Sequence, residues 1–151
     1  MPVTNSPDLI PYEYAIIRVV PRVERGERVN VGVVLFCRQR RFLAARVGLE
    51  AHHQVALSAL APDLNMEAIT ERLNVIVKVC AGGEEARPVG LLNQAERFRW
   101  LVAPSSTVVQ PSAVHVGRCT DPELELDQLY ETTVAAVDVE DRRASVTTPG
   151  R

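Results

Sequence analysis

Strand-like patterns of apolar residues occupy the first third of the chain. Residues 12–20 are rich in β-branched and aromatic side chains, end at Pro21, and predict a strand with apolar residues on both faces. Residues 24–36 begin as a charged turn around Gly26 and continue as a second strand. Residues 42–47 predict a third strand after a short arginine-rich turn. The three segments predict an antiparallel meander.

The second predicted strand carries different residues on its two faces. One face is expected to be buried and consists of Val29, Val31, Val33 and Leu35. The other face has a polar end, where Arg28, Asn30 and Gly32 become candidate binding residues. A glycine inside a strand has no side chain to pack, so Gly32 indicates a β-bulge or a close approach by another backbone. The alternative is a polar strand end whose Asn30 hydrogen-bonds a neighbouring loop.

Helical spacing of apolar residues begins after Gly48. Residues 51–60 predict a short helix, and Asp63 or Asn65 can cap a longer one that ends at Gly82. The apolar stripe of that longer helix comprises Met66, Ile69, Leu73, Ile76, Val77 and Cys80. A third helix is predicted over residues 94–102. In it, Phe98, Leu101 and Val102 pack inward while Arg97 and Arg99 flank them.

The end of the chain supplies one more strand and one more helix. Residues 107–116 predict a fourth strand, in which Pro111 lacks the N–H that a ladder needs and so belongs at an edge or a break. Thr120 or Asp121 can cap a last helix that runs to about Val137. The predicted fold is therefore α+β. It has an antiparallel sheet of about four strands, the meander plus this later strand, with helices packed mainly on one face.

Length and composition fit one domain. The chain has 151 residues, of which 46% are apolar and 24% are charged, values ordinary for a globular protein. We expect a flexible N-terminal arm over residues 1–11, a single domain over residues 12–137, and a disordered tail over residues 138–151. No apolar run approaches the roughly 18 residues of a membrane span, and the N-terminus lacks a signal pattern, so a cytoplasmic location is expected.

Charge is distributed unevenly along the chain. Residues 1–46 contain eight arginines and four acids, whereas residues 121–141 contain eight acids and no base. Arginine suits contacts to carboxylate or phosphate, although the excess of arginine can also reflect a GC-rich genome. Arg18 lies in a row of apolar residues, where its charge must reach solvent or find a carboxylate, with Glu24 and Glu27 as candidate partners.

The common signatures of cofactor enzymes are missing from the sequence. No phosphate-binding loop, dinucleotide fingerprint, nucleophile elbow or zinc-protease motif is present, and the three cysteines form no C-x-x-C pair. His52 and His53 are adjacent and are expected to face apart on a helix. We therefore expect no cofactor and no metal. The alternative is a metal-dependent enzyme acting on a phosphate ester or nucleic acid, with Glu24, Glu27 and Asn30 around an ion.

In that alternative, Arg25 or Arg97 would neutralise phosphate. Binding of nucleic acid without such catalysis ranks third, because the pattern shows no helix-turn-helix and aromatic residues make up only 5% of the chain. Membrane binding is not indicated.

The segment from Glu96 to Ser106 combines a tryptophan with arginines and hydroxyl groups. Trp100, with Arg97 and Arg99 nearby and Ser105 and Ser106 after it, can anchor an interface, since tryptophan and arginine are frequent in binding hot spots. The equally weighted alternative is that Trp100 is in the core and the serines cap a turn.

Three segments together resemble the bacterial domain of unknown function 3037 family. They are Y-E-Y-A-I-I-R-V-V-P, E-R-V-N-V-G-V-V-L-F and E-R-F-R-W-L-V-A-P-S-S, in that order, and H-V-G-R-C-T-D-P also fits. The matching positions are Arg18, Glu27, Asn30, Gly32, Arg97, Phe98, Pro104 and Ser106. The resemblance covers about residues 12–134 and implies no established activity. It implies an accessory or antitoxin-like role beside a HipA-like serine/threonine kinase.

The leading hypothesis is a non-enzymatic binding module that associates with another protein, a HipA-like kinase by resemblance, and modulates it. Two polar segments carry this hypothesis. Arg28, Asn30 and Gly32 at a strand end are expected to form one surface with Arg97, Trp100 and Ser106, provided that the helix over residues 94–102 docks beside the strand. The basic rim of that surface would speed encounter with an acidic partner.

Overall fold

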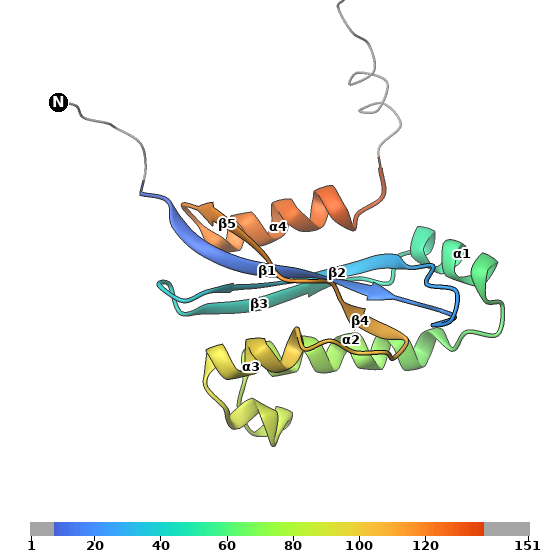
Figure 1. The fold of residues 1–151 in the computed structure, drawn as a ribbon, viewed down its shortest axis with the longest axis horizontal. Helices are drawn as coiled ribbons and strands as arrows, with labels where there is room; N and C mark the ends of the chain where they lie inside the picture. The colour runs from blue at the N-terminus through green and yellow to red at the C-terminus, as the bar shows by residue number, and fades with distance from the viewer. Residues whose placement is uncertain (1–7, 138–151) are drawn as a thin grey trace, which may run out of the picture.

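The computed structural model describes residues 8–137, which form an α+β domain (Figure 1). Its antiparallel sheet contains β1 (Ile10–Val19), β2 (Val29–Cys37), β3 (Phe42–Val47), β4 (Val109–Pro111) and β5 (His115–Cys119). The strand order is β3-β2-β1-β4, and β5 also pairs with β1. The predicted α+β fold with an antiparallel meander is confirmed. β1 begins within the segment predicted as an arm, and the predicted tail lies outside the described residues.

Helices cover both faces of the sheet (Figure 1). They are α1 (Ala51–Leu60), α2 (Met66–Ala81), α3 (Gln94–Leu101) and α4 (Pro122–Thr133), with short 3-10 turns at Glu84–Ala86 and Val89–Leu91. The first three contribute Leu57, Leu73 and Phe98 to one core cluster. α4 lies on the opposite face, where Leu126 and Tyr130 belong to a second cluster. No helix within residues 8–137 is long and apolar enough to cross a membrane.

A β-bulge in β2 distributes its side chains between these two clusters. Ile17 of β1 pairs with Gly32 and Arg18 pairs with Asn30, so Val31 is an extra residue without a partner in β1. Val31 consequently faces the α2 and α3 side, whereas Val33 faces α4. The bulge that Gly32 indicated is confirmed. The prediction that Val29, Val31, Val33 and Leu35 share one face was wrong, because the extra residue reverses the alternation.

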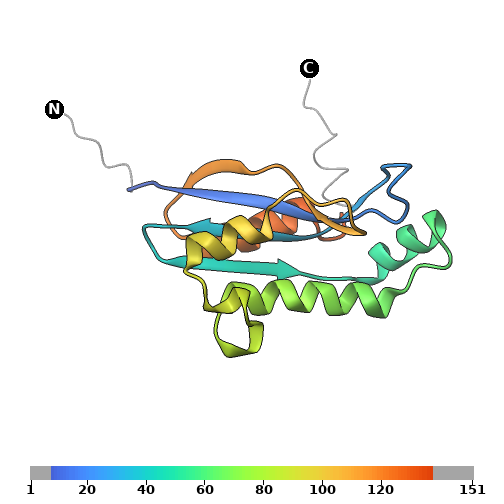
Figure 2. The same cartoon turned by 60° about the horizontal axis from the view of Figure 1, so that its bottom comes forward.

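Gly32 also lies close to the backbone of β3. Gly32 pairs with Val47, and a Cβ atom built on it would stand 2.8 Å from Cγ1 of Val47 and 3.1 Å from the carbonyl oxygen of Arg46. Glycine is therefore the residue that lets β3 approach β2 at the bulge. α2 packs beneath β3 on the same side of the molecule (Figure 2).

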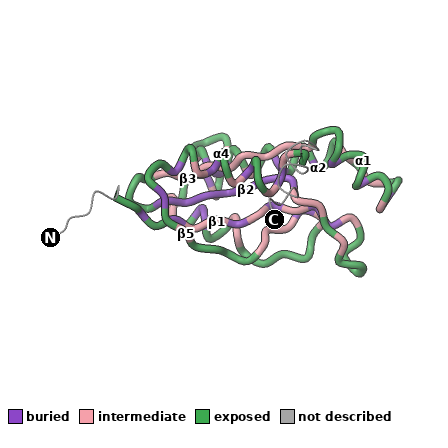
Figure 3. The backbone as a smooth tube through the Cα atoms, turned by 90° about the horizontal axis from the view of Figure 1, so that it is seen from above, coloured by how far each residue is buried: buried purple, intermediate pink, exposed green. Residues whose placement is uncertain are grey.

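The predicted fourth strand is two short strands, β4 and β5, which both pair with β1. Pro111 ends β4, and Ser112 then replaces the regular ladder: its N–H donates to the carbonyl of Ile16 at 2.7 Å, and its Oγ accepts from the N–H of Ile16 at 2.8 Å. The break follows from the missing N–H of Pro111, as expected for a proline at a strand end. Residues 109–119 are mostly exposed or half-buried, whereas the middle of β1 and β2 is buried (Figure 3).

Side chains cap the two long helices where the sequence predicted. Asn65 accepts a hydrogen bond from the N–H of Ala68 at the start of α2. Asp121 accepts from the N–H groups of Glu123 and Leu124 at the start of α4, with Pro122 at its first position. α4 ends at Thr133, four residues before the predicted end at Val137. Each cap satisfies donors that the first helical turn leaves unpaired.

Replacing Gly32 by alanine is expected to destabilise the domain by about 1–3 kcal/mol, because the added Cβ would overpack against Val47 and the Arg46 carbonyl. Chemical denaturation measures the loss. Adding Val47→Ala should reduce the cost of Gly32→Ala, since Cγ1 of Val47 is the closest atom. Strictly additive effects of the two substitutions would contradict this account of Gly32.

Candidate functional site

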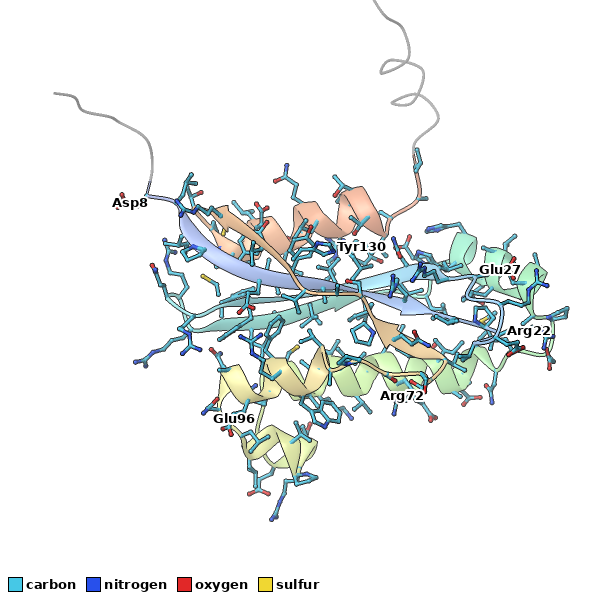
Figure 4. The ribbon with its side chains drawn as sticks, in the orientation of Figure 1. Asp8, Arg22, Glu27, Arg72, Glu96 and Tyr130 are labelled. Carbon is cyan, nitrogen blue, oxygen red and sulfur yellow. The ribbon has the colours of Figure 1, made fainter. Side chains whose placement is uncertain are left out.

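The structure separates the two polar segments that were expected to form one surface. Asn30 donates from Nδ2 to the carbonyl of Thr133 at 3.2 Å, so it faces α4. α3 lies on the other face of the sheet, where the Phe98 ring is 5.3 Å from that of Phe36, near the far end of β2. Figure 4 shows the same separation between Glu27 and Glu96. The expectation that α3 docks beside the polar end of β2 was wrong, because Phe98 packs with the apolar half of that strand.

The loop before β2 makes local contacts. Arg25 Nε donates to a carboxylate oxygen of Glu27 at 2.6 Å, and this hydrogen bond holds the pKa of Glu27 below its usual value. Glu24 is exposed in the same loop. Glu27 thus turns to Arg25 while Asn30 turns to α4, so the residues of the metal-enzyme alternative do not converge. Within residues 8–137, no group of three or more His, Cys, Asp or Glu is placed to hold a metal ion.

Arg18 forms no ion pair with either expected carboxylate. Its NH2 donates weakly to the carbonyl of Pro111 at 3.4 Å, and its buried Nε has no hydrogen-bond partner among the described residues. Burial, followed by the nearby charge of Arg28, lowers the pKa of Arg18. The side chain therefore lies at the end of β1, between the sheet and solvent, with only part of its hydrogen-bonding capacity used.

Arg97 is buried and holds the end of α2. Its NH1 donates to the carbonyls of Val79 and Cys80 at 2.9 and 2.6 Å, and its Nε donates to that of Leu92 at 3.0 Å. The last carbonyls of a helix lack partners within the helix and carry partial negative charge, so a guanidinium there satisfies them. The expectation that Arg97 shares an exposed surface with Trp100 and Ser106 was wrong for this reason.

Arg99, two residues further along α3, is an exposed counterpart to Arg97. Its guanidinium makes two hydrogen bonds, at 3.1 and 3.3 Å, to the carboxylate of Glu13 on β1. Both side chains are partly open to solvent, so the pair adds little to stability. Arg99 and Glu13 instead tie the outer surface of α3 to the sheet.

A groove runs between α2 and the segment that connects α3 to β4, and we call it the α2 groove. Its first hollow, of about 210 Å³, has Trp100 on its rim, and Trp100 is 49% exposed. The residues around this hollow are Ile17, Val34, Arg72, Val75, Ile76, Trp100, Leu101, Ala103, Pro104, Ser105, Val109, Gln110 and Pro111. Trp100 is therefore a surface residue, which resolves the alternative that the sequence left open.

A second hollow continues the α2 groove toward the start of α2. It measures about 340 Å³, is lined largely by apolar side chains, and shares Arg72 and Val109 with the first hollow. Figure 4 shows Arg72 on α2, next to β4. Arg72 is exposed and forms no ion pair with any residue of the described range 8–137. One unneutralised cation thus stands in the middle of a mainly apolar groove.

The hydroxyl groups after α3 have separate positions. Ser105 lines the first hollow and lies 2.8 Å from the hydroxyl of Thr107, so it braces the wall of the groove. Ser106 is exposed and is not among the lining residues. Of the binding residues predicted from the sequence, Trp100 and Ser105 therefore line the groove. It adds Arg72, which no motif distinguished from the other charged residues of a helix.

The contact between His52 and His53 at the start of α1 was not predicted from the sequence. The rings of His52 and His53 lie 3.8 Å apart, and both Nε2 atoms contact the carbonyl of Val134, at 3.2 and 2.9 Å. The two rings do not face apart as predicted, because α1 begins here and the Glu50 N–H donates to His53 Nδ1. The sequence did contain a signal for this arrangement. Glu50 is followed three residues later by His53, a spacing typical of a capping box at a helix start.

The hydrogen bonds of His53 define its protonation. Nδ1 accepts from the Glu50 N–H, so Nε2 carries the proton that is donated to Val134. Burial lowers the pKa of His53, with a smaller contribution from the neighbouring His52. Tyr130 donates its hydroxyl to Glu50, and burial raises the pKa of Tyr130 to about 12. This junction joins α1 to α4 through hydrogen bonds from the two histidines to Val134 and from Tyr130 to Glu50.

Arg97→Met should reduce the free energy of unfolding by about 2–4 kcal/mol, because three carbonyls lose a charged donor in a buried place. The matched control is Arg99→Met on the same helix, which should cost less than about 1 kcal/mol because its ion pair is exposed. Denaturant titration of both variants makes the comparison. Equal losses would show that Arg97 does not hold α2.

The stability of the domain should fall as pH drops through about 6.5. Burial holds the pKa of His53 in the folded protein below its ordinary value of 6.5, so the unfolded chain binds a proton first and is favoured at lower pH. Thermal denaturation at several pH values from about 7.5 to 5 measures the slope. His53→Gln should flatten this part of the profile, whereas His115→Gln, at an exposed position of β5, should leave it unchanged. A profile that is equally steep in His53→Gln would contradict the assignment.

Comparison with known proteins identifies the family of the chain. A family model described as Protein of unknown function (DUF3037) matches residues 14–134. The match spans the whole sheet from Tyr14 onward, the α2 groove, and α4 with its contact to the histidine pair. No curated protein and no solved structure matches the chain. The chain belongs to the DUF3037 family.

Proposed function

We propose that this protein is a non-enzymatic binding module that receives a segment of a partner protein in the α2 groove. The observation that carries the proposal is the position of Trp100, half exposed on the rim of a mainly apolar groove. Tryptophan buries up to about 250 Å² in a protein, so covering the exposed half would contribute roughly 2–3 kcal/mol. A single side chain thus offers a large part of the binding energy of a moderate complex.

The length of the groove favours a polypeptide segment as the occupant. Its α2 wall runs from Asn65 to Ile76, a distance of about 16 Å along the helix axis. An extended chain of about five residues has that length. Two hollows in series suit successive apolar side chains of such a segment, and few polar groups line the larger hollow.

Arg72 determines the expected charge of the segment. It stands where the two hollows meet, and no carboxylate within residues 8–137 neutralises it. An aspartate or glutamate between two apolar side chains of the partner would pair with this guanidinium, and a lysine or arginine at the same place would be repelled. The partner segment is therefore apolar with a central acid.

A HipA-like serine/threonine kinase is the proposed partner, and its modulation is the proposed role. This assignment rests on the family resemblance, while the chemistry of the groove supports binding of a protein segment in general. An accessory, antitoxin-like role needs no catalytic group in this chain, which agrees with a site built from an aromatic ring, apolar walls and one cation. The α2 groove replaces the single surface expected from the sequence.

Binding of the kinase should be visible in the fluorescence of Trp100, the only tryptophan of the chain. If the partner covers the ring, its emission should shift to shorter wavelength, and a Trp-free kinase variant would keep the signal specific. Trp100→Ala should weaken the complex by about 30-fold or more, as expected for a hot spot worth at least 2 kcal/mol. Arg72→Glu should also weaken the complex, and the loss should be larger at low salt, where charge repulsion is less screened.

Val55→Ala is the control for these variants, because Val55 is 71% exposed on α1 and lies outside the α2 groove. It should leave affinity unchanged. Copurification from the native host at low salt, with kinase activity assayed in the presence and absence of this protein, tests the partner. If neither Trp100→Ala nor Arg72→Glu affects the complex, the kinase remains the partner but the α2 groove is not its binding site. Absence of any complex would refute the kinase assignment.

A further inference from the structure

The outer edge of β5 has backbone groups that no residue of the range 8–137 pairs with. Ile16 of β1 directs both its N–H and its carbonyl toward Ser112, on the side of the sheet where β4 and β5 lie. Because these directions alternate along a strand, Tyr14 and Tyr12 direct theirs toward His115 and Gly117. Val116 and Arg118 lie between those hydrogen-bonded positions. Their N–H and carbonyl groups therefore point away from β1.

The side chains of Val116 and Arg118 stand on the same face of the sheet as α3. Val116 pairs with Glu13 and Arg118 pairs with Pro11, and Val116 is 79% exposed. Val116 also borders a shallow hollow of about 240 Å³, whose other residues include Phe36 and Arg38. The hollow lies on the β1 side of Val116, so a strand added at the outer edge of β5 would lie beyond Val116, next to its exposed side chain.

The surface around Val116 carries positive charge without a counterion. The carboxylate of Glu13 is already engaged by Arg99. Arg38 lies over the ring of Phe36, 5.8 Å from its centre. Neither Arg38 nor Arg118 forms an ion pair with a residue in the described range. The guanidinium of Arg118 thus lies beside an exposed valine at the strand edge, and that of Arg38 lies across the hollow from it.

We infer that the edge of β5 binds an extended acidic segment of a partner protein as an additional strand. The backbone groups of Val116 and Arg118 pair with those of the incoming strand. A carboxylate of that strand lies opposite Arg118, and an apolar residue lies opposite Val116. A second copy of this chain is a poor occupant of this edge. Pairing β5 with β5 would bring further arginines together and supply no carboxylate to neutralise them.

This second surface is separate from the α2 groove. The groove is built from α2, the end of α3, the segment after it and β4, and β4 pairs with β1 at residues 17–19. β5 pairs with the opposite end of β1, at residues 10–14. Figure 3 shows the β5 path along the outer margin of the sheet. One partner can therefore be held at two places, and each surface can be tested without disturbing the other.

Amide hydrogen exchange on the full-length, isotope-labelled chain tests the inference. The probe is a short capped peptide with valine and glutamate alternating along one face and threonine on the other; the control peptide has lysine in place of glutamate. In the protein alone, the amides of Val116 and Arg118 should exchange quickly, while those of His115 and Gly117 are protected. The acidic peptide should slow exchange at Val116 and Arg118, and should bind at least about tenfold more tightly than the basic one.

Two variants distinguish strand addition from general charge attraction. Val116→Pro removes an outward N–H but no hydrogen bond to β1, so it should abolish protection at the edge while His115 and Gly117 stay protected. Arg118→Glu should reverse the preference, so that the lysine peptide binds more tightly. Equal binding of both peptides, binding that survives Val116→Pro, or no binding at all would overturn the inference. So would protection of these amides that rises with protein concentration without peptide, because that result identifies a second copy as the occupant.

Discussion

A strand that is apolar on both faces must be covered on both faces, and β1 and β2 impose this requirement on the whole domain. Ile17 and Val31 need one layer of helices, whereas Tyr12 and Val33 need another. The extra residue in β2 divides its side chains between the two layers. The chain therefore has to build α2 and α3 beneath the sheet and return with α4 above it. Removing either layer would expose the central strands to water.

The α2 groove is a consequence of how α2 and α3 are joined. Arg97 binds the last carbonyls of α2, and Phe98 packs under Phe36, so α3 can take only one position beside the sheet. Trp100 follows within one helical turn, so the backbone that carries it is held at the groove rim. A structural arginine and a core phenylalanine thus fix the position of the helix that presents the exposed tryptophan. The hydroxyl contacts after α3 hold the facing wall.

Local chemistry made the element types and caps predictable. Gly32, Asn65 and the pair Asp121 and Pro122 each carry a conformational or hydrogen-bonding preference that acts within a few residues. The candidate site was less predictable, because Arg97 and Trp100 are placed by contacts to distant segments. Nothing in the sequence near Arg97 indicates that the end of α2 lies against it. Period-two alternation also failed beyond Val31, since a bulge changes the faces without changing the composition of the strand.

The hydrogen bonds of Arg97 bear on how relatives of this protein should be read. Its three acceptors are main-chain carbonyls, which every residue type carries, so Val79, Cys80 and Leu92 can be exchanged for other side chains that pack. The guanidinium has no such substitute, because no other side chain offers donors in that fork. Evolution can therefore preserve this arginine amid changing neighbours purely to keep the chain assembled. An arginine kept at this position in a relative would then mark the architecture of the domain and not a ligand site.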